Sequence, residues 1–284
     1  DPWITGSNFA TAVTYLNTID GTTAHTAATI EASVATVTAA GDPTSIGSTF
    51  VLTTGTDAAG KTSASNGTIS NTFRFTDTGN EVVTADIGTL QAADVLLDGS
   101  STDSDVLNIT ANATTNAFSA NRIETINLDS AAGAPTLVMT NVTNTDTINV
   151  SGNVATLING LDVGAKDPLI KTDAYTRVLT VDTARLSGTV AAGNAETLSL
   201  EVSGSSYGTT AATRSGITLT AQTGSDTLET LNITSSGSAA NDFELLAGTN
   251  VVLDTVNISG TADLTMRVDH VDVTGYTIAS TNTG

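Results

Sequence analysis

The stretch "ETINLDS" (residues 124–130) contains a five-residue pattern that recurs along the chain: an acid, any residue, an aliphatic residue, a polar residue and an aliphatic residue. We call this pattern the pentad. Strong copies occupy residues 105–109, 124–128, 146–150, 196–200, 229–233 and 254–258, and weaker copies occupy 177–181 and 269–273. Most successive copies lie roughly 15 to 35 residues apart, a spacing typical of repeat proteins.

In an extended strand, the third and fifth positions of a pentad face one way and the second and fourth face the other. If each pentad is one rung of a parallel β-solenoid, the rungs stack about 4.8 Å apart and the aliphatic residues form an internal column. Asn127, Asn149, Asn232 and Asn257 then align outside, where their amides can hydrogen-bond from rung to rung. The alternative is a string of antiparallel β-sandwiches, but hairpin signals are few and the copies are closely alike.

The first residues follow a different period. Apolar residues recur at helical spacing in "NFATAVTYLNTI" (8–19) and again in "TAATIEASVATVTAA" (26–40), before the breaker "GDP". We therefore predict a small helical element over residues 1–46 and a Thr-rich β-solenoid repeat domain over residues 47–284. The chain begins "DPWITGS", from which we expect a processed product or part of a longer protein.

The composition restricts the partners and the interior. Hydrophobic residues make up 39 % of the chain but aromatic residues only 4 %, so we expect an aliphatic core. A formal charge of −20 disfavours nucleic acid and favours cations, although acidity can also serve solubility alone. Cysteine is absent, so no disulfide or thiolate metal site exists. Bound divalent ions are the obvious alternative cross-link. No apolar run approaches the roughly 20 residues that span a membrane.

One acidic stretch is a candidate metal site. "ADVLLDGSSTDSDVLNIT" (93–110) places Asp98, Asp103 and Asp105 around Gly99, just before the first strong pentad. Calcium takes six to eight oxygen ligands at flexible spacing. We predict that the three aspartates bind calcium and that Gly99 supplies the turn; the alternative is a solvated acidic loop. For the leading acids of the other pentads, capping of turn amides or solvation is favoured over a shared cation.

A family resemblance rests on "FVLTTGTD" (50–57), "LQAADVLLDGSSTDSDVLNI" (90–109) and "NRIETINLDS" (121–130). These stretches resemble the surface-layer (S-layer) proteins of Gram-negative bacteria that belong to the calcium-binding, type I-secreted repeats-in-toxin (RTX) group. The resemblance implies a secreted, calcium-dependent protein that self-assembles into a lattice on the cell surface, often held by lipopolysaccharide. The consensus turn glycine falls on Gly99, and consensus acids fall on Asp98 and Asp105.

The chain also departs from that family. Ser100 and Ser101 replace two consensus glycines, one extra residue separates Gly99 from Asp105, and the RTX nonapeptide is absent, so we expect an isolated calcium site rather than a tandem stack.

The leading hypothesis is a structural S-layer protein, and the alternative is an adhesin or stalk segment of a large secreted protein. We expect no enzyme activity, since His25 and His270 are the only histidines and neither belongs to a recognisable triad. Solenoid enzymes that act on polysaccharides generally use aromatic and basic grooves, but this chain has one Trp and four Tyr.

Overall fold

The computed structural model describes residues 49–60, 75, 79–152, 154–164, 166–184, 196–206, 215–221, 228–248, 251, 253–270 and 277–284, and the structural statements below concern these residues. They form β-strands and no helix. The predicted helical element of residues 1–46 lies outside them. In this described part of the chain, no helix is long and apolar enough to cross a membrane.

The strands form three sheets. The ten-stranded sheet contains β1 (Thr49–Val51), β3 (Val82–Asp86), β5 (Val106–Ala111), β7 (Thr125–Ser130), β10 (Thr147–Gly152), β12 (Leu169–Asp173), β14 (Glu196–Ser203), β16 (Leu228–Ser236), β18 (Thr255–Gly260) and β20 (Thr277–Ser280). The four-stranded sheet contains β2 (Ala58–Gly60), β4 (Val95–Leu97), β6 (Ser119–Asn121) and β9 (Val142–Thr143). The six-stranded sheet contains β8 (Thr136–Val138), β11 (Thr156–Asp162), β13 (Val178–Ala184), β15 (Gly216–Ala221), β17 (Asn241–Ala247) and β19 (Leu264–His270).

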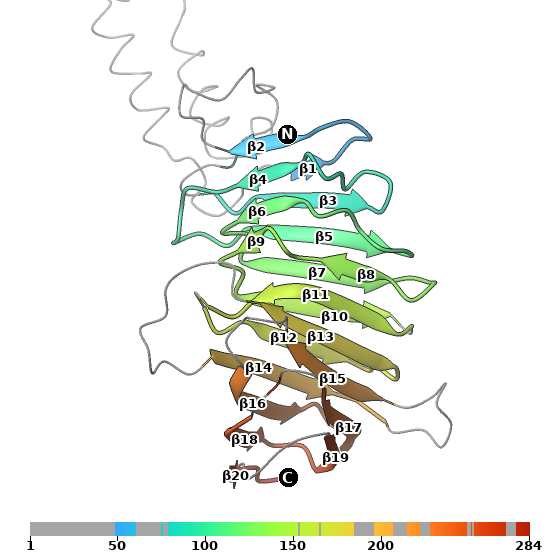
Figure 1. Cartoon of the computed structure of the whole chain (residues 1–284), viewed down its shortest axis with the longest axis vertical. Helices are drawn as coiled ribbons and strands as arrows, with labels where there is room; N and C mark the ends of the chain where they lie inside the picture. Colours follow the sequence, from blue (N-terminus) through green and yellow to red (C-terminus); the bar gives the residue numbers. More distant parts are fainter. Residues whose placement is uncertain are drawn as a thin grey trace, which may run out of the picture.

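The chain passes back and forth between the ten-stranded sheet and one of the two smaller sheets, so that each turn adds one parallel strand to each side. The four-stranded sheet accompanies the first part of the ten-stranded sheet, and the six-stranded sheet accompanies the rest. Between β7 and β10 the chain forms a strand of each smaller sheet, β8 in the six-stranded sheet and β9 in the four-stranded sheet. Figure 1 shows the resulting stack, which runs from the N-terminal strands to β20. All described strand pairs are parallel, which confirms a β-solenoid-like structure and excludes antiparallel sandwiches there.

Aliphatic residues at the inward positions form the core, as predicted. Leu107, Ile126, Ile148 and Ile170 lie opposite one another in successive strands, and none of them has any exposed surface. Burial of each such side chain stabilises the fold by roughly 1.5–3 kcal/mol. The core therefore continues from rung to rung instead of being gathered at one centre.

The predicted asparagine ladder is present on the outer face of the ten-stranded sheet. Asn127 Nδ2 donates to Asn108 Oδ1 at 2.8 Å, and Asn149 Nδ2 donates to Asn127 Oδ1 at 2.7 Å. A second section joins Asn257 Nδ2 to Asn232 Oδ1 at 2.9 Å. Each amide both packs on and hydrogen-bonds to its neighbour, which holds the register of the strands.

The two sections of the ladder are separated at β12. Lys171 lies opposite Asn149 and ends the first section. Beyond β12, the pentads are displaced by two residues relative to the earlier pentads. Ile148 is the third residue of its pentad and pairs with Ile170. Ile170 pairs in turn with Leu200, which is the fifth residue of its pentad. Since a shift of two preserves the inward and outward faces, the core column continues across the break.

The six strong pentads all lie in the ten-stranded sheet, whereas the described residues of the two weaker copies lie in the six-stranded sheet. Residues 177–181 enter β13, and residues 269–270 end β19, both in the six-stranded sheet; residues 271–273 are outside the described part. The alternation of aliphatic and polar residues is shared by strands of every sheet, so it does not identify the sheet. Conversely, residues 81–85, "EVVTA", fit the pattern and form β3, a copy that the sequence analysis missed.

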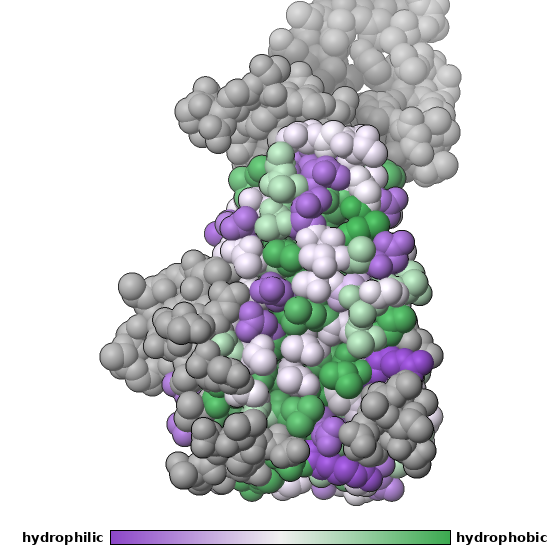
Figure 2. Space-filling view, turned by 45° about the vertical axis from the view of Figure 1, so that its right-hand side comes forward, coloured by the Kyte–Doolittle hydropathy of each residue, from purple (hydrophilic) through white to green (hydrophobic). Residues whose placement is uncertain are grey.

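The surface carries hydrophobic and hydrophilic residues in small interspersed patches on the face shown in Figure 2. Among the described residues, the exposed large hydrophobic side chains are Val51, Leu97, Val268 and Ile278. Three of these four belong to the first or last described strands of the sheets.

Removal of one ladder amide should weaken the stack. We expect Asn127→Ala to lower the free energy of unfolding by about 1–2 kcal/mol, because it removes two side-chain hydrogen bonds and leaves the amides of Asn108 and Asn149 with one partner fewer. The exposed Asn112, substituted by Ala, is the matched control and should change the urea midpoint little. Equal effects of the two substitutions would contradict a stabilising ladder.

Candidate metal centre

The corner that contains the predicted site is longer than the equivalent corners of the next rungs. Eight residues, 98–105, separate β4 from β5, whereas three residues, 122–124, separate β6 from β7 and three residues, 144–146, separate β9 from β10. Because Leu97 lies opposite Asn121 and Val106 lies opposite Thr125, the strands on either side remain in register. The extra residues therefore form a local loop beside strands that stay in register, and this loop carries Asp103.

The loop is organised by the side chain of Asp98. Asp98 Oδ2 accepts a hydrogen bond from the backbone N–H of Ser100, and the Ser100 hydroxyl accepts one from the N–H of Thr102 at 3.1 Å. Gly99 is not among the described glycines of positive φ, so its conformational freedom is not what makes the turn. Its carbonyl oxygen accepts a hydrogen bond from Arg122 Nη1 at 2.8 Å, which ties the loop to the next rung.

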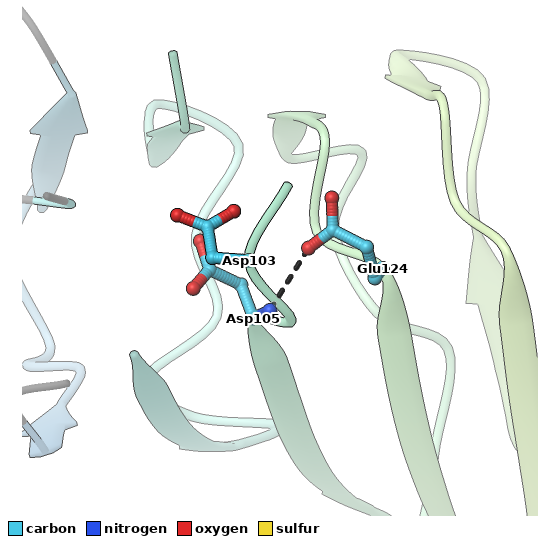
Figure 3. A group of neighbouring side chains, drawn as sticks. All are labelled: Asp103, Asp105 and Glu124. Carbon is cyan, nitrogen blue, oxygen red and sulfur yellow. Dashed lines mark hydrogen bonds between the residues drawn. The ribbon is translucent and has the colours of Figure 1, made fainter. Parts of the chain in front are cut away.

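Glu124 and Asp105 join successive rungs through their carboxylates. Glu124 Oε2 accepts a hydrogen bond from the backbone N–H of Asp105 at 2.8 Å, as Figure 3 shows. Asp105 Oδ1 in turn accepts one from the N–H of Glu81 at 2.8 Å. Each leading acid therefore caps an amide of the rung before it, so that three acids are stacked along one corner of the fold.

Asp103, Asp105 and Glu124 form the one carboxylate cluster among the described residues that is suited to a metal ion. One carboxylate oxygen from each lies within 4.8 Å of the others, and Figure 3 shows Asp103 and Asp105 side by side with Glu124 beside them at the start of β7. Asp105 is fully buried, and Asp103 and Glu124 are partly buried.

Several carboxylate oxygens in this corner are buried without any hydrogen-bond partner. They are Asp98 Oδ1, both carboxylate oxygens of Asp103 and Asp105 Oδ2, and they account for four of the five such side-chain atoms in the described residues. A buried oxygen without a donor costs free energy of about 1–3 kcal/mol, and more when it is charged. This concentration of unsatisfied oxygens in one loop is what a bound cation would relieve.

The electrostatics of the corner agree with the geometry. Burial, together with the charges of Glu81, Asp98 and Asp103, raises the pKa of Asp105 to about 8, although the hydrogen bond from Glu81 opposes the rise. Burial and the charge of Asp103 raise the pKa of Asp98. Burial also raises the pKa of Glu124, with smaller contributions from the charges of Asp103 and Asp146. The carboxylates thus destabilise one another unless protons or a cation offset their charge.

The donor set consists of oxygen atoms and carries a high negative charge, which is the chemistry of a hard divalent cation. The structure brings Asp103 and Asp105 together, and the charge of Asp98 contributes to the raised pKa of Asp105. The sequence analysis missed Glu124 as a member of this group. The available signal was that Glu124 heads the next pentad, which stacks directly on the pentad headed by Asp105.

Other acids at strand entries have different partners. Both carboxylate oxygens of Asp94 accept backbone hydrogen bonds, from Asp57 at 2.8 Å and from Gln91 at 2.7 Å. Asp146 forms an ion pair with Lys166. In the later part of the stack, Glu229 Oε2 accepts the N–H of Glu196 at 2.8 Å, which repeats the capping seen at Glu124. For these acids, the capping of amides that we favoured from the sequence accounts for most of the observed contacts.

Comparison of the chain with protein-family models, with curated proteins and with solved structures gave no match. The resemblance to RTX-type S-layer proteins therefore stays a prediction from short sequence stretches. The arguments about this site rest on its own geometry.

Without metal, the stability of the protein should fall as the pH rises from about 4 to 8. The pKa of Asp105 is about 8 in the folded protein against an ordinary value of 3.8, so in this window the folded state holds a proton that the unfolded state has lost. In chelator, Asp105→Asn should remove much of this slope and raise stability at pH 8 by on the order of a few kcal/mol. Urea titrations at several pH values measure both effects.

The control for this prediction is Asp129→Asn, which removes one exposed carboxylate from the same sheet and should leave the slope nearly unchanged. An unchanged slope in Asp105→Asn would show that this buried carboxyl does not take up the proton.

Proposed function

We propose that this chain is a structural surface-layer protein that self-assembles into an extracellular two-dimensional lattice and binds calcium at the corner between β4 and β5. The observation that supports this proposal best is the group of buried, unpartnered carboxylate oxygens of Asp98, Asp103 and Asp105 in the inserted loop. Burial of like charges without hydrogen-bond donors strongly destabilises a fold unless a cation is present.

Calcium fits this corner better than the other common cations. It accepts six to eight oxygens in flexible geometry, including carboxylates that bind through one or two oxygens, whereas magnesium requires a near-ideal octahedron and retains waters. Asp98, Asp103 and Asp105 supply four unpartnered oxygens, and Glu124 supplies a further carboxylate from the next rung. No thiol or imidazole lies in this donor group, which argues against zinc and copper.

An ion held by Asp103, Asp105 and Glu124 would connect the loop before β5 to the start of β7. It would therefore fasten one rung to the next at the place where the inserted loop interrupts the regular corner. In a chain without cysteine, this is the mechanical role that a disulfide has in other extracellular proteins.

Assembly into a lattice is supported by the physical character of the stack and by the RTX resemblance. The ten-stranded sheet gives a long, regular body, and its outer columns carry threonine and asparagine side chains. Copies of a chain with a net charge of −20 repel one another in the absence of cations, so divalent ions would promote their contact. The same ions could bridge the acidic surface to phosphate groups of lipopolysaccharide or another cell-surface glycan.

The alternative function is an adhesin or stalk segment, in which the same stack acts as a spacer. The two functions differ in what calcium does. A stalk becomes more rigid with calcium while it stays monomeric, whereas an S-layer protein forms sheets.

The experiment combines calorimetry with electron microscopy of the full chain. We expect calcium to bind, to raise the unfolding temperature and to produce two-dimensional sheets. Asp103→Asn combined with Asp105→Asn should weaken calcium binding at least about tenfold, because it replaces two anionic ligands by neutral amides. The matched control neutralises two acids outside the cluster, Asp129→Asn with Asp173→Asn, and should bind like the parent protein.

The outcomes separate the parts of the proposal. Unchanged calcium binding in the Asp103 and Asp105 variant would remove this corner as the site. Calcium binding without sheets would leave the site in place and favour the stalk. Sheets that form equally well in chelator would contradict a role for calcium in assembly.

A further inference from the structure

The corner between β6 and β7 begins with an arginine in a strained backbone conformation. Arg122 has a φ of 59°, in the left-handed region that side chains other than asparagine and aspartate rarely adopt. The equivalent corner of the next rung has Asn144 at this position, also with a φ of 59°. The fold therefore requires this conformation here, and arginine is a poor choice for it. Such strain persists where contacts of the side chain offset it, which is common at ligand sites.

The side chain of Arg122 reaches back to the preceding rung. Its Nη1 donates a hydrogen bond to the carbonyl oxygen of Gly99 at 2.8 Å. Because the donor is charged, this bond is roughly twice as strong as one between neutral groups. The backbone N–H of Arg122 donates to the carbonyl oxygen of Thr143 on the following rung at 3.2 Å. This residue therefore joins the loop of residues 98–105 to the two rungs that come after it.

Gly99 lies at the start of the hydrogen bonds that organise the loop. The residue before it, Asp98, accepts the N–H of the residue after it, Ser100, and the Ser100 hydroxyl accepts the N–H of Thr102. Asp103 follows directly and carries two of the unpartnered carboxylate oxygens. A contact that fixes the carbonyl of Gly99 therefore restricts the segment that places Asp103.

We infer that Arg122 is a positioning residue for the calcium site proposed above, because its guanidinium holds the loop in the arrangement in which Asp103 lies beside Asp105 before the ion binds. The inference rests on the proposed function, since it concerns the affinity of that site. Glu124, the ligand from the next rung, lies on the same three-residue corner as Arg122. The ion and the guanidinium thus connect the same two segments, and each contact should strengthen the other.

The charge of Arg122 by itself predicts the opposite effect. A positive charge near a cation site weakens cation binding, so removal of the charge alone should tighten the binding of calcium. If the side chain positions the loop, its removal should weaken calcium binding in spite of the more favourable charge. The sign of the change in calcium affinity therefore separates the two roles.

The first test is calorimetric titration of the full chain with calcium chloride. Arg122→Asn should raise the dissociation constant about tenfold, which is typical when a residue that supports a metal ligand is lost. Since asparagine is the residue that the next rung has at this corner, the urea midpoint in chelator should not fall. Arg122→Lys keeps the charge and a donor group but loses the planar guanidinium, and it should restore part of the affinity.

The matched control is Arg267→Gln in β19. It removes the same charge from a strand that lies far along the stack from β6 (Figure 1). Because exposed charges at long distance are screened by salt, the dissociation constant of this variant should change by less than about twofold.

The second test is hydrogen exchange in chelator, which measures the loop without calcium. In Arg122→Asn, the amide of Ser100 should exchange at least about fivefold faster than in the parent protein, because the loop opens more often. The amide of Asp105 is held by Glu124 and is the internal control, so its rate should stay the same.

The outcomes separate this inference from the proposed function. A parent protein that binds no calcium would overturn both. If the parent binds calcium and Arg122→Asn binds it equally well or more tightly, the inference alone falls. Weaker binding with a matching loss of stability in chelator, or an unchanged exchange rate at Ser100, would also contradict a positioning role.

Discussion

Parallel pairing of each strand with the strand one turn later is the interaction on which this structure depends. The pairing aligns residues of the same pentad position, so that Ile126 lies opposite Ile148 and Asn127 lies opposite Asn149. Hydrophobic burial on the inner face and amide hydrogen bonds on the outer face therefore both follow from one register. A core made of such columns needs few aromatic residues, which agrees with their small share of the chain.

The same alignment explains why the acidic corner is unusual. Pairing in register stacks the leading acids of successive pentads, and stacked carboxylates repel. Glu229 accepts a backbone amide hydrogen bond, although burial and the charges of Glu196 and Asp254 still raise its pKa. Asp146 forms an ion pair with Lys166. At Asp105, one oxygen is capped in this way, but the other stays unpartnered and faces a loop that adds Asp98 and Asp103. The stack thus uses repetition for stability and places its carboxylate cluster beside the loop of residues 98–105.

Much of the fold could be predicted because the pentad carries local information. Its alternation specifies which side chains face inward, and the repeated asparagine at the fourth position specifies the ladder. The weaker copy at 177–181 forms part of β13 in the six-stranded sheet, because the same alternation of aliphatic and polar residues is present there. Asp103 and Asp105 were predicted because they are near in sequence. Glu124 was missed because it reaches the cluster through the stacking of rungs, which the loop sequence does not reveal.

The amino-acid sequence by itself determined the alternation, the aliphatic interior, the asparagine ladder and the position of the acidic loop, because each is expressed within a few residues of the chain. Only the tertiary structure decided which sheet each strand joins, where the ladder shifts at β12 and which carboxylate oxygens are left without donors. Those properties depend on contacts between residues about twenty or more positions apart, and such contacts exist only after the strands have stacked.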